Sequence, residues 1–207
     1  MVYLVKTPNA FKPFAADMLW SIDQTPNVVY LTFDDGPTKE ITLQILDILD
    51  EYNAKATFFC IGGNIIANPD IYSEILMRGH RTGNHTWNHM NGWKYSDFSY
   101  LKNVLQCDEV MRTSLFRPPY GRIKRSQVKG LKHRFTIVMW DVLSGDWSAD
   151  VSPKKCLQNV VKNTRSGSIV VFHDSKKAEK NMLYALPRTL KELSEKGFVF
   201  EALPEMY

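Results

Sequence analysis

Two adjacent carboxylates, Asp34 and Asp35, directly follow an apolar run that ends at Phe33. Two carboxylates at the end of an apolar strand are costly to desolvate unless a positive partner meets them, and a metal ion is such a partner. Gly36 and Pro37 come next, so a strand-ending turn is the alternative interpretation, because Asp, Gly and Pro are also common turn residues. The pair is therefore a candidate for a metal ligand and a general base, and spacing alone does not assign the two roles.

Two histidines, His85 and His89, lie four positions apart in the segment 84–89. On a helical turn this spacing places both imidazoles on one face, where they can bind one ion, as in other His-x-x-x-His zinc pairs. A pair of surface histidines is the alternative interpretation. With one carboxylate, the two histidines would make a metal site that keeps positions open for water and substrate, which is typical of a catalytic metal.

A third histidine, His173, ends the apolar run 169–172, and that run would bring its ring to the same end of a sheet. If one carboxylate of the Asp pair binds a metal, the other can act as general base and His173 as general acid. His80 and His133 have no such context, and we expect them to be structural or exposed to solvent.

Two further segments, 117–121 and 141–147, also place polar groups after apolar runs. The paired prolines of the first segment fix its backbone, so the N–H of Tyr120 can be presented to a ligand, although a rigid loop needs no such role. In the second segment Asp146 stands beside Trp147. An aromatic next to an acid often walls a sugar site, but a half-buried tryptophan that packs a barrel rim is the ordinary alternative.

Seven strand-like apolar runs alternate with amphipathic stretches, which predicts βα units and a largely parallel sheet. The runs span residues 28–33, 56–61, 81–84, 115–117, 135–142, 168–172 and 198–201. Helices are expected at 41–52, with Thr38 as N-cap, and near 65–78, 97–112, 153–163 and 179–196. An open doubly wound sheet and an incomplete (β/α) barrel both fit, and both place their sites at the carboxyl ends of the strands.

The composition is that of an ordinary globular protein, with 44% hydrophobic and 23% charged residues. A length of 207 residues suits one domain with a substantial core, so we expect a single domain over 1–207. The net charge of +4 is scattered, which does not favour a nucleic-acid partner. Three cysteines without a Cys-x-x-Cys pair are expected to be reduced thiols.

No stretch of the sequence is long and apolar enough for a membrane-spanning helix, and the apolar run at the amino terminus is too short for a signal peptide. As written, the chain is expected to stay in the cytoplasm. If an export segment has been removed, the periplasm or the cell wall becomes the expected location. The oligomeric state is not indicated by any pattern, and a monomer is assumed.

The five segments, in this order, resemble the motifs of the polysaccharide deacetylases of carbohydrate esterase family four, the group that contains chitin, chitooligosaccharide and peptidoglycan deacetylases. The resemblance extends from about residue 28 to about residue 200. It implies an α/β fold, a distorted and incomplete (β/α) barrel of parallel strands. It also implies a metal-dependent hydrolase that removes N-acetyl groups from an N-acetylated oligo- or polysaccharide of the N-acetylglucosamine or N-acetylmuramic type and releases acetate.

The family pattern assigns roles that spacing left open. It makes Asp34 the general base, and Asp35, with His85 and His89, the metal ligands. Thr86 would help to hold the loop between the histidines. Two nitrogens and one carboxylate oxygen suit Zn²⁺ best, and Co²⁺ or Ni²⁺ would fit the same ligands.

By the same resemblance, Arg117 would orient Asp34 through a charge-assisted hydrogen bond. The backbone N–H of Tyr120 would help to stabilise the oxyanion. Asp146 would pair with His173 and keep it protonated as the acid for the leaving amine.

The substrate side of the predicted site rests on fewer residues. Trp147 would shape the acetyl pocket, and Val171 stands where the family usually has a leucine. The gap between Asp141 and Asp146 is longer than in the commonest form of the family, so Asp141 receives no role. Aromatic residues near the predicted rim could form a platform for several sugar rings or belong to the core; the candidates are Trp87, Trp93, Tyr95 and Trp147. An O-acetyl esterase on an acetylated polysaccharide and a non-catalytic sugar-binding relative are the competing functions.

Overall fold

The sheet of this protein is curled and parallel. The computed structural model describes residues 4–8, 16–22 and 26–205. Within them the strands run in the order β1-β6-β5-β4-β3-β2-β8-β7, with β9 beside β2, and every pair of these strands is parallel. The strands are β1 (Met18–Leu19), β2 (Val28–Asp34), β3 (Ala56–Cys60), β4 (Arg81–Asn84), β5 (Leu115–Phe116), β6 (Thr136–Val138), β7 (Val142–Leu143), β8 (Ile169–His173) and β9 (Val199–Phe200).

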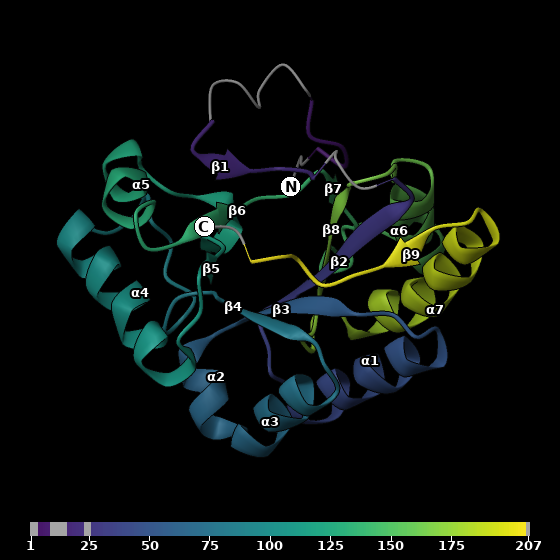
Figure 1. Cartoon of the computed structure of the whole chain (residues 1–207), viewed down its shortest axis with the longest axis horizontal. Coiled ribbons are helices and arrows are strands. Elements are labelled where there is room, and N and C mark those ends of the chain that lie inside the picture. Colours follow the sequence, from purple (N-terminus) through teal and green to yellow (C-terminus); the bar gives the residue numbers. More distant parts are fainter. Residues whose placement is uncertain (1–3, 9–15, 23–25, 206–207) are drawn as a thin grey trace.

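Helices lie around the outside of the curled sheet (Figure 1). They are α1 (Lys39–Glu51), α2 (Gly62–Ala67), α3 (Pro69–Met77), α4 (Asp97–Met111), α5 (Arg125–Leu131), α6 (Pro153–Val161) and α7 (Glu179–Glu195), with a short 3-10 helix at Pro119–Gly121. The arrangement is a distorted, incomplete (β/α) barrel, so the predicted fold class is confirmed. Within the described residues, none of the helices is long and apolar enough to cross a lipid bilayer.

The structure corrects several predicted elements. The expected helix over 65–78 is two helices that break before Pro69, because proline lacks the N–H that continues a helix and its ring clashes with the preceding turn. The expected strand over 135–142 is split into β6 and β7, which lie far apart in the strand order of the sheet. The two-residue β1 and the seven-residue α5 were not predicted, and both are too short to give a clear periodic pattern.

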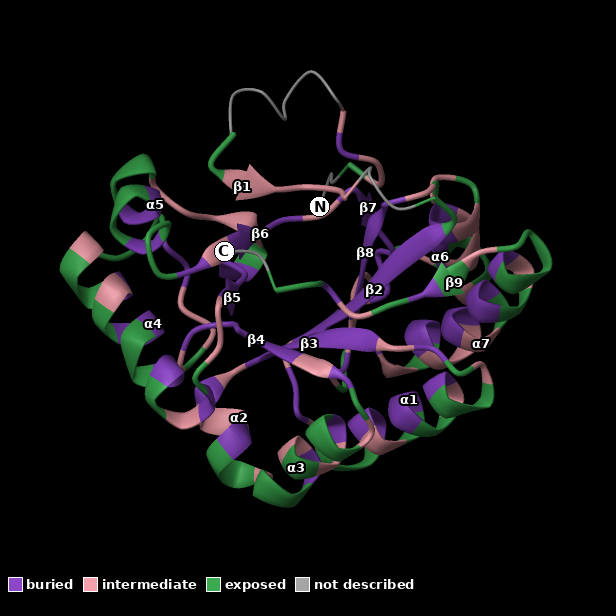
Figure 2. Cartoon of the chain, in the orientation of Figure 1, coloured by how far each residue is buried: buried purple, intermediate pink, exposed green. Residues whose placement is uncertain are grey.

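The side chains of β2 point alternately toward the helices and into the barrel. Val29, Leu31 and Phe33 belong to the large cluster that packs against the helices. Val28 and Tyr30 belong to a second cluster, whose members come from the inward faces of several strands. Since side chains alternate between the faces of a strand, Asp34 must point into the barrel. Figure 2 shows the buried strands surrounded by helices that are exposed on their outer sides.

The C-terminal segment covers the end of the barrel at which the strands begin. In Figure 1 this yellow segment crosses in front of the strands. The N–H of Leu203 donates to Thr57 Oγ1 at 2.9 Å, and Arg81 Nη1 donates to the Leu203 carbonyl at 2.9 Å. Thr57 and Arg81 lie at the start of β3 and β4, and the Leu203 side chain is fully buried in the interior cluster. The other end of the barrel, where the strands finish, is therefore the end at which a site can open.

Several predictions about single residues are confirmed. The three cysteines are buried free thiols. His80 is buried, its Nδ1 accepts from the Ala56 N–H at 3.2 Å, and burial lowers its pKa to about 4. His133 is exposed. Neither histidine contributes to the site described below.

Candidate active site

Asp34 and Arg117 meet inside the barrel because of strand alternation. Leu115 of β5 faces the interior and Phe116 faces the helices, so Arg117 points inward again. Asp34 ends β2 in the same orientation, and Arg117 Nη1 donates to Asp34 Oδ1 at 2.6 Å. The predicted charge-assisted hydrogen bond between these residues is therefore present.

The Arg117 guanidinium is fully buried and all three of its nitrogens donate. Beyond Asp34, it donates to Thr32 Oγ1 at 2.8 Å and to the carbonyls of Val138 and Met139 at 3.3 and 3.0 Å. Burial alone would raise the pKa of Asp34, but the charge of Arg117, with smaller contributions from two histidines, outweighs burial and lowers it. Asp34 is thus held as a carboxylate that can accept a proton.

Asp35, His85 and His89 bring one ligand atom each to within 4.8 Å of one another. His89 Nε2 lies 3.2 Å and His85 Nε2 lies 3.7 Å from Asp35 Oδ1. This oxygen is buried and has no hydrogen-bond partner among the described residues. Burial lowers the pKa of His85 to about 4 and also lowers that of His89, so both rings are neutral at neutral pH.

The convergence of these three groups fits a metal ion. His85 Nδ1 lies 2.8 Å from the Arg117 carbonyl, which can only accept, so Nδ1 carries the proton and Nε2 directs its lone pair to the cluster. A carboxylate oxygen and the lone pair of His85 Nε2 repel each other unless a cation lies between them. A cation bound among these groups would supply the partner that the buried Asp35 oxygen lacks.

The histidine pair does not lie on a helical turn, so that part of the sequence argument was wrong. Thr86 and His89 have φ of 67° and 59°, which is left-handed and excludes a regular helix. The turn is held by the Thr86 Oγ1, which accepts from the Met90 N–H at 2.9 Å. Asp35 also has a positive φ, 87°. Such positions in non-glycine residues concentrate at functional sites.

Tyr120 sits beside the histidines in another left-handed position, with φ of 60°. Its ring lies 4.5 Å from the His89 ring, centroid to centroid. The hydrogen bonds that close this turn are donated by the N–H groups of Gly121 and Arg122, to Pro118 and Pro119 respectively at 3.0 and 3.1 Å. These bonds do not use the Tyr120 N–H, and its role as a donor to ligand stays a prediction.

His173 and Asp146 form the third part of the site. His173 is the register partner of Asp34 on the neighbouring strand β8. Asp146 accepts from the His173 backbone N–H at 2.7 Å, and its other oxygen lies 2.9 Å from His173 Nδ1. Burial would lower the pKa of His173, but the Asp146 carboxylate, aided by Asp34 and Asp35, raises it to about 9. His173 is thus an imidazolium at neutral pH, beside the Trp147 ring at 4.9 Å.

Asp174 is a buried residue beside the site that the sequence argument left without a role. Its two oxygens accept from the Gly36 N–H at 2.8 Å and from the Thr42 hydroxyl at 2.7 Å. A Cβ on Gly36 would lie 1.8 Å from Asp174 Oδ2, so the carboxylate packs directly against the loop that carries Asp35. The sequence signal that could have pointed to Asp174 is its position directly after His173, at the end of an apolar run.

Asp141 is remote from this site. It pairs with Lys6 Nζ at 2.6 Å and accepts from Ser168 Oγ at 2.7 Å. Ser168 precedes β8, whose opposite end carries His173. Asp141 thus ties the N-terminal segment to the closed end of the barrel, which also gives residues 4–8 a structural role.

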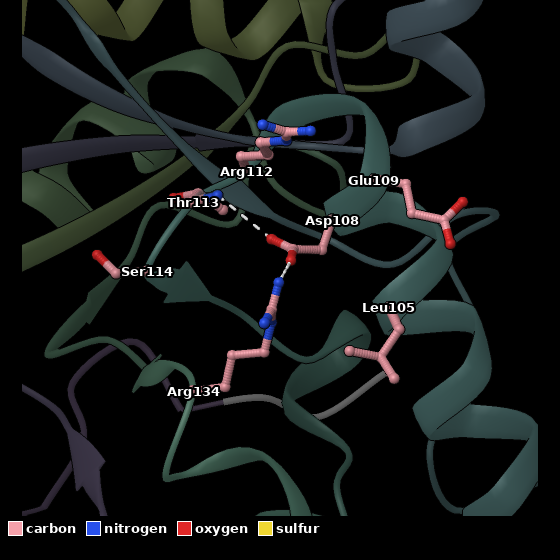
Figure 3. Close-up of a pocket in the computed structure, with 7 residues that line it drawn as sticks. All are labelled: Leu105, Asp108, Glu109, Arg112, Thr113, Ser114 and Arg134. Carbon is pink, nitrogen blue, oxygen red and sulfur yellow. Dashed lines mark hydrogen bonds and ion pairs between the residues drawn. The ribbon is translucent and has the colours of Figure 1, made fainter.

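A polar hollow lies near the C-terminal end of α4 and the start of β5, at the end of the barrel opposite to the site (Figure 3). The buried Asp108 in this hollow accepts from the Arg134 guanidinium and from the Thr113 N–H. Both of its oxygens are therefore occupied by donors of the protein. The residues that line the hollow include no histidine, so they do not repeat the cluster of Asp35, His85 and His89.

Comparison with known proteins finds similar sequences over most of the chain. The sequence pattern of the family described as polysaccharide deacetylase matches residues 21–134. The chain is 34% identical over 195 residues to a peptidoglycan-N-acetylglucosamine deacetylase of Bacillus cereus, with 90% of this chain and 91% of that protein covered. It is 32% identical over 187 residues to the peptidoglycan-N-acetylmuramic acid deacetylase PdaC of Bacillus subtilis, with 86% and 38% covered.

The fold of this chain is also similar to that of a solved structure. The crystal structure of the Bc1960 peptidoglycan N-acetylglucosamine deacetylase, in complex with a hydroxamate-type benzamide, superposes with a TM-score of 0.88 at 33% identity. That superposition covers 97% of each chain. Together with the family match over more than half of the sequence, these similarities place the chain in the polysaccharide deacetylase family.

Proposed function

We propose that the protein is a metal-dependent hydrolase that removes N-acetyl groups from N-acetylglucosamine or N-acetylmuramic acid units of an oligo- or polysaccharide. The observation that carries this proposal is the pairing of Asp34, held as a carboxylate, with His173, held as an imidazolium, on neighbouring strands. Two titratable groups with opposite pKa shifts are what a base and an acid in one reaction need. The names of the similar proteins supply the sugar substrates.

The metal ligands in this proposal are Asp35, His85 and His89. Two imidazole nitrogens and one carboxylate oxygen favour Zn²⁺, while Co²⁺ or Ni²⁺ would fit the same set. A divalent ion held there would polarise the acetyl carbonyl and acidify the attacking water.

The chain's own groups account for the proton transfers. Asp34 accepts a proton from the attacking water, and Arg117 fixes the carboxylate in place. The Tyr120 N–H donates to the oxygen that becomes negative when water adds to the acetyl carbon. His173, held at Nδ1 by Asp146, donates its other ring proton to the departing sugar nitrogen as the carbon–nitrogen bond breaks. The products are acetate and a free amine.

We assign the acetyl methyl group to a pocket formed by Trp147 and Val171. Trp147 packs beside the His173 ring, and Val171 is buried two residues before His173, on the same face of β8. Both side chains therefore lie next to the proposed acid.

Acetate release tests this function. Purified protein is incubated with N-acetylglucosamine oligomers, with peptidoglycan fragments and with acetylated xylan, each with added Zn²⁺ or Co²⁺ and with chelator. We expect metal-dependent acetate release from the N-acetylated substrates, matched by an equal amount of free amine. Release from acetylated xylan alone would support an O-acetyl esterase instead. No release from any substrate by metal-loaded protein would favour the non-catalytic relative.

The pH profile should depend on Asp146. Because its carboxylate raises the pKa of His173, Asp146→Asn is expected to lower that pKa and to move the alkaline limb of kcat by about one pH unit or more toward lower pH. Activity falls above the pKa of His173, since only the imidazolium can donate. Asp150→Asn, which changes an exposed carboxylate of the same loop, should keep the original profile. An unmoved alkaline limb in Asp146→Asn would mean that Asp146 acts only by holding the loop.

A further inference from the structure

Trp93 is an exposed aromatic residue that the protein holds rigidly. Trp93 is 59% exposed, yet its indole Nε1–H donates to the Ile123 carbonyl at 3.2 Å. The Arg122 guanidinium lies 5.2 Å from the centroid of its ring. By contrast, Trp87 packs against the main core, so it does not belong to a sugar platform. Tryptophan, with an apolar ring and one hydrogen-bonding N–H, is enriched at binding interfaces.

The backbone beneath Trp93 is fixed as well. The Trp93 N–H donates to Asn91 Oδ1 at 3.1 Å, and the fully buried Gln127 donates to the Gly92 carbonyl at 3.0 Å. A Cβ on Gly92 would lie 2.5 Å from the Arg122 carbonyl, so the loops of Trp93 and Arg122 are pressed together. The orientation of the indole is therefore set before any ligand arrives, which reduces the entropy cost of binding.

The same two loops supply part of the proposed active site. Trp93 follows the metal ligand His89 by four residues, and Arg122 follows Tyr120 by two. The rings of His89 and Tyr120 are 4.5 Å apart, and the Arg122 guanidinium lies 5.2 Å from the centroid of the Trp93 ring. The surface of Trp93 and Arg122 is thus continuous with the rim of the metal site.

Arg122 carries a charge that the described part of the chain does not neutralise with a carboxylate at ion-pair distance. Nearby Lys124 differs, since its Nζ lies 3.8 Å from Asp97 and donates to the Tyr95 carbonyl at 2.6 Å. A guanidinium presents planar paired donors that match a carboxylate. The chemistry that Arg122 offers to a ligand is therefore recognition of an acidic group.

We propose that Trp93 and Arg122 form a subsite for the sugar unit next to the one that is deacetylated. Trp93 stacks on the apolar face of that neighbouring ring, and Arg122 binds a carboxylate carried by the glycan strand. This inference rests on the proposed deacetylase function and adds a preference to it: the enzyme acts on acidic chains in preference to neutral ones.

Steady-state acetate release from the full-length, metal-loaded protein tests the subsite. Trp93→Ala should raise KM about fivefold for neutral N-acetylglucosamine oligomers and for peptidoglycan fragments, with kcat unchanged. Trp93→Phe keeps a stacking face without the indole N–H and should recover most of the affinity. Arg122→Gln should raise KM only for the fragments that bear carboxylates, and added salt should shrink that difference.

Tyr184→Ala and Arg188→Gln are matched controls. Arg188 and Tyr184 form another arginine–aromatic pair on α7, with the guanidinium 3.9 Å from the centroid of the ring. Both substitutions should leave KM unchanged. Unaltered KM in Trp93→Ala, with an active wild type, would overturn the stacking role. An equal rise for neutral and acidic substrates in Arg122→Gln would overturn the carboxylate role. A wild type that releases no acetate would instead overturn the proposed function itself.

Discussion

Asp34→Asn is expected to lower kcat about a thousandfold while the metal content stays the same. The amide keeps the size of the side chain and its hydrogen bond from Arg117, but it has no basic oxygen that can take the water proton. Metal content should persist because the ligand atoms come from Asp35, His85 and His89. Acetate release and elemental analysis of the same preparation give both quantities. Activity within tenfold of wild type would contradict the role of Asp34 as general base.

This variant also has a stability cost that must be separated from catalysis. The substitution removes the negative partner of a fully buried guanidinium, and breaking such a buried pair costs about 3 kcal/mol or more. Asp141→Asn is the matched control, because it removes a buried carboxylate that pairs with Lys6 at the far end of the barrel. Both variants should unfold at lower denaturant concentration than wild type, but only Asp34→Asn should lose kcat.

The contrast between Asp141 and Asp146 illustrates what could be predicted from the sequence. Both acids fall within one motif, and the sequence places that motif after an apolar run. In the structure the two-residue strand β7 passes between them, so Asp141 lies before the strand and Asp146 after it. Only the second reaches the rim where strands end. A strand of two residues has no periodic signal, and its position depends on hydrogen bonds to β8 that come from distant sequence.

The main strands and the meeting of Asp34 with His173 could be predicted because they obey a simple rule, whereas the role of Arg117 was an expectation from the family resemblance. Long apolar runs become strands, and alternation along each strand decides which side chains point into the barrel. The carboxyl ends of parallel strands lie at the same end of the barrel. The local shape around the histidine pair follows no such rule. Thr86 and His89 adopt left-handed conformations, which are uncommon in non-glycine residues, and the Thr86 hydroxyl helps to hold this turn. Spacing therefore predicted that the two histidines come together, as they do beside Asp35, but through the wrong local geometry.

His85→Ala is expected to abolish metal binding and to reduce acetate release to the background level. His85 is buried, its Nδ1 is held by the Arg117 carbonyl, and its Nε2 is directed at the Asp35 carboxylate, so no neighbouring group can take its place. His89→Ala should weaken binding less, because that ring is 26% exposed and water can replace it as a ligand. Elemental analysis after dialysis, with acetate release measured in parallel, compares the two variants.

Thermal unfolding gives a second test that does not depend on turnover. A metal ion that binds only the folded protein stabilises it, by about 2.7 kcal/mol when its concentration is a hundred times the dissociation constant. Zn²⁺ should therefore raise the Tm of wild type and of Asp34→Asn, but not that of His85→Ala. His133→Ala, a change of an exposed histidine, should respond like wild type. If His85→Ala kept the zinc-dependent rise in Tm, the ion would lie elsewhere and the assignment of Asp35, His85 and His89 would have to be withdrawn.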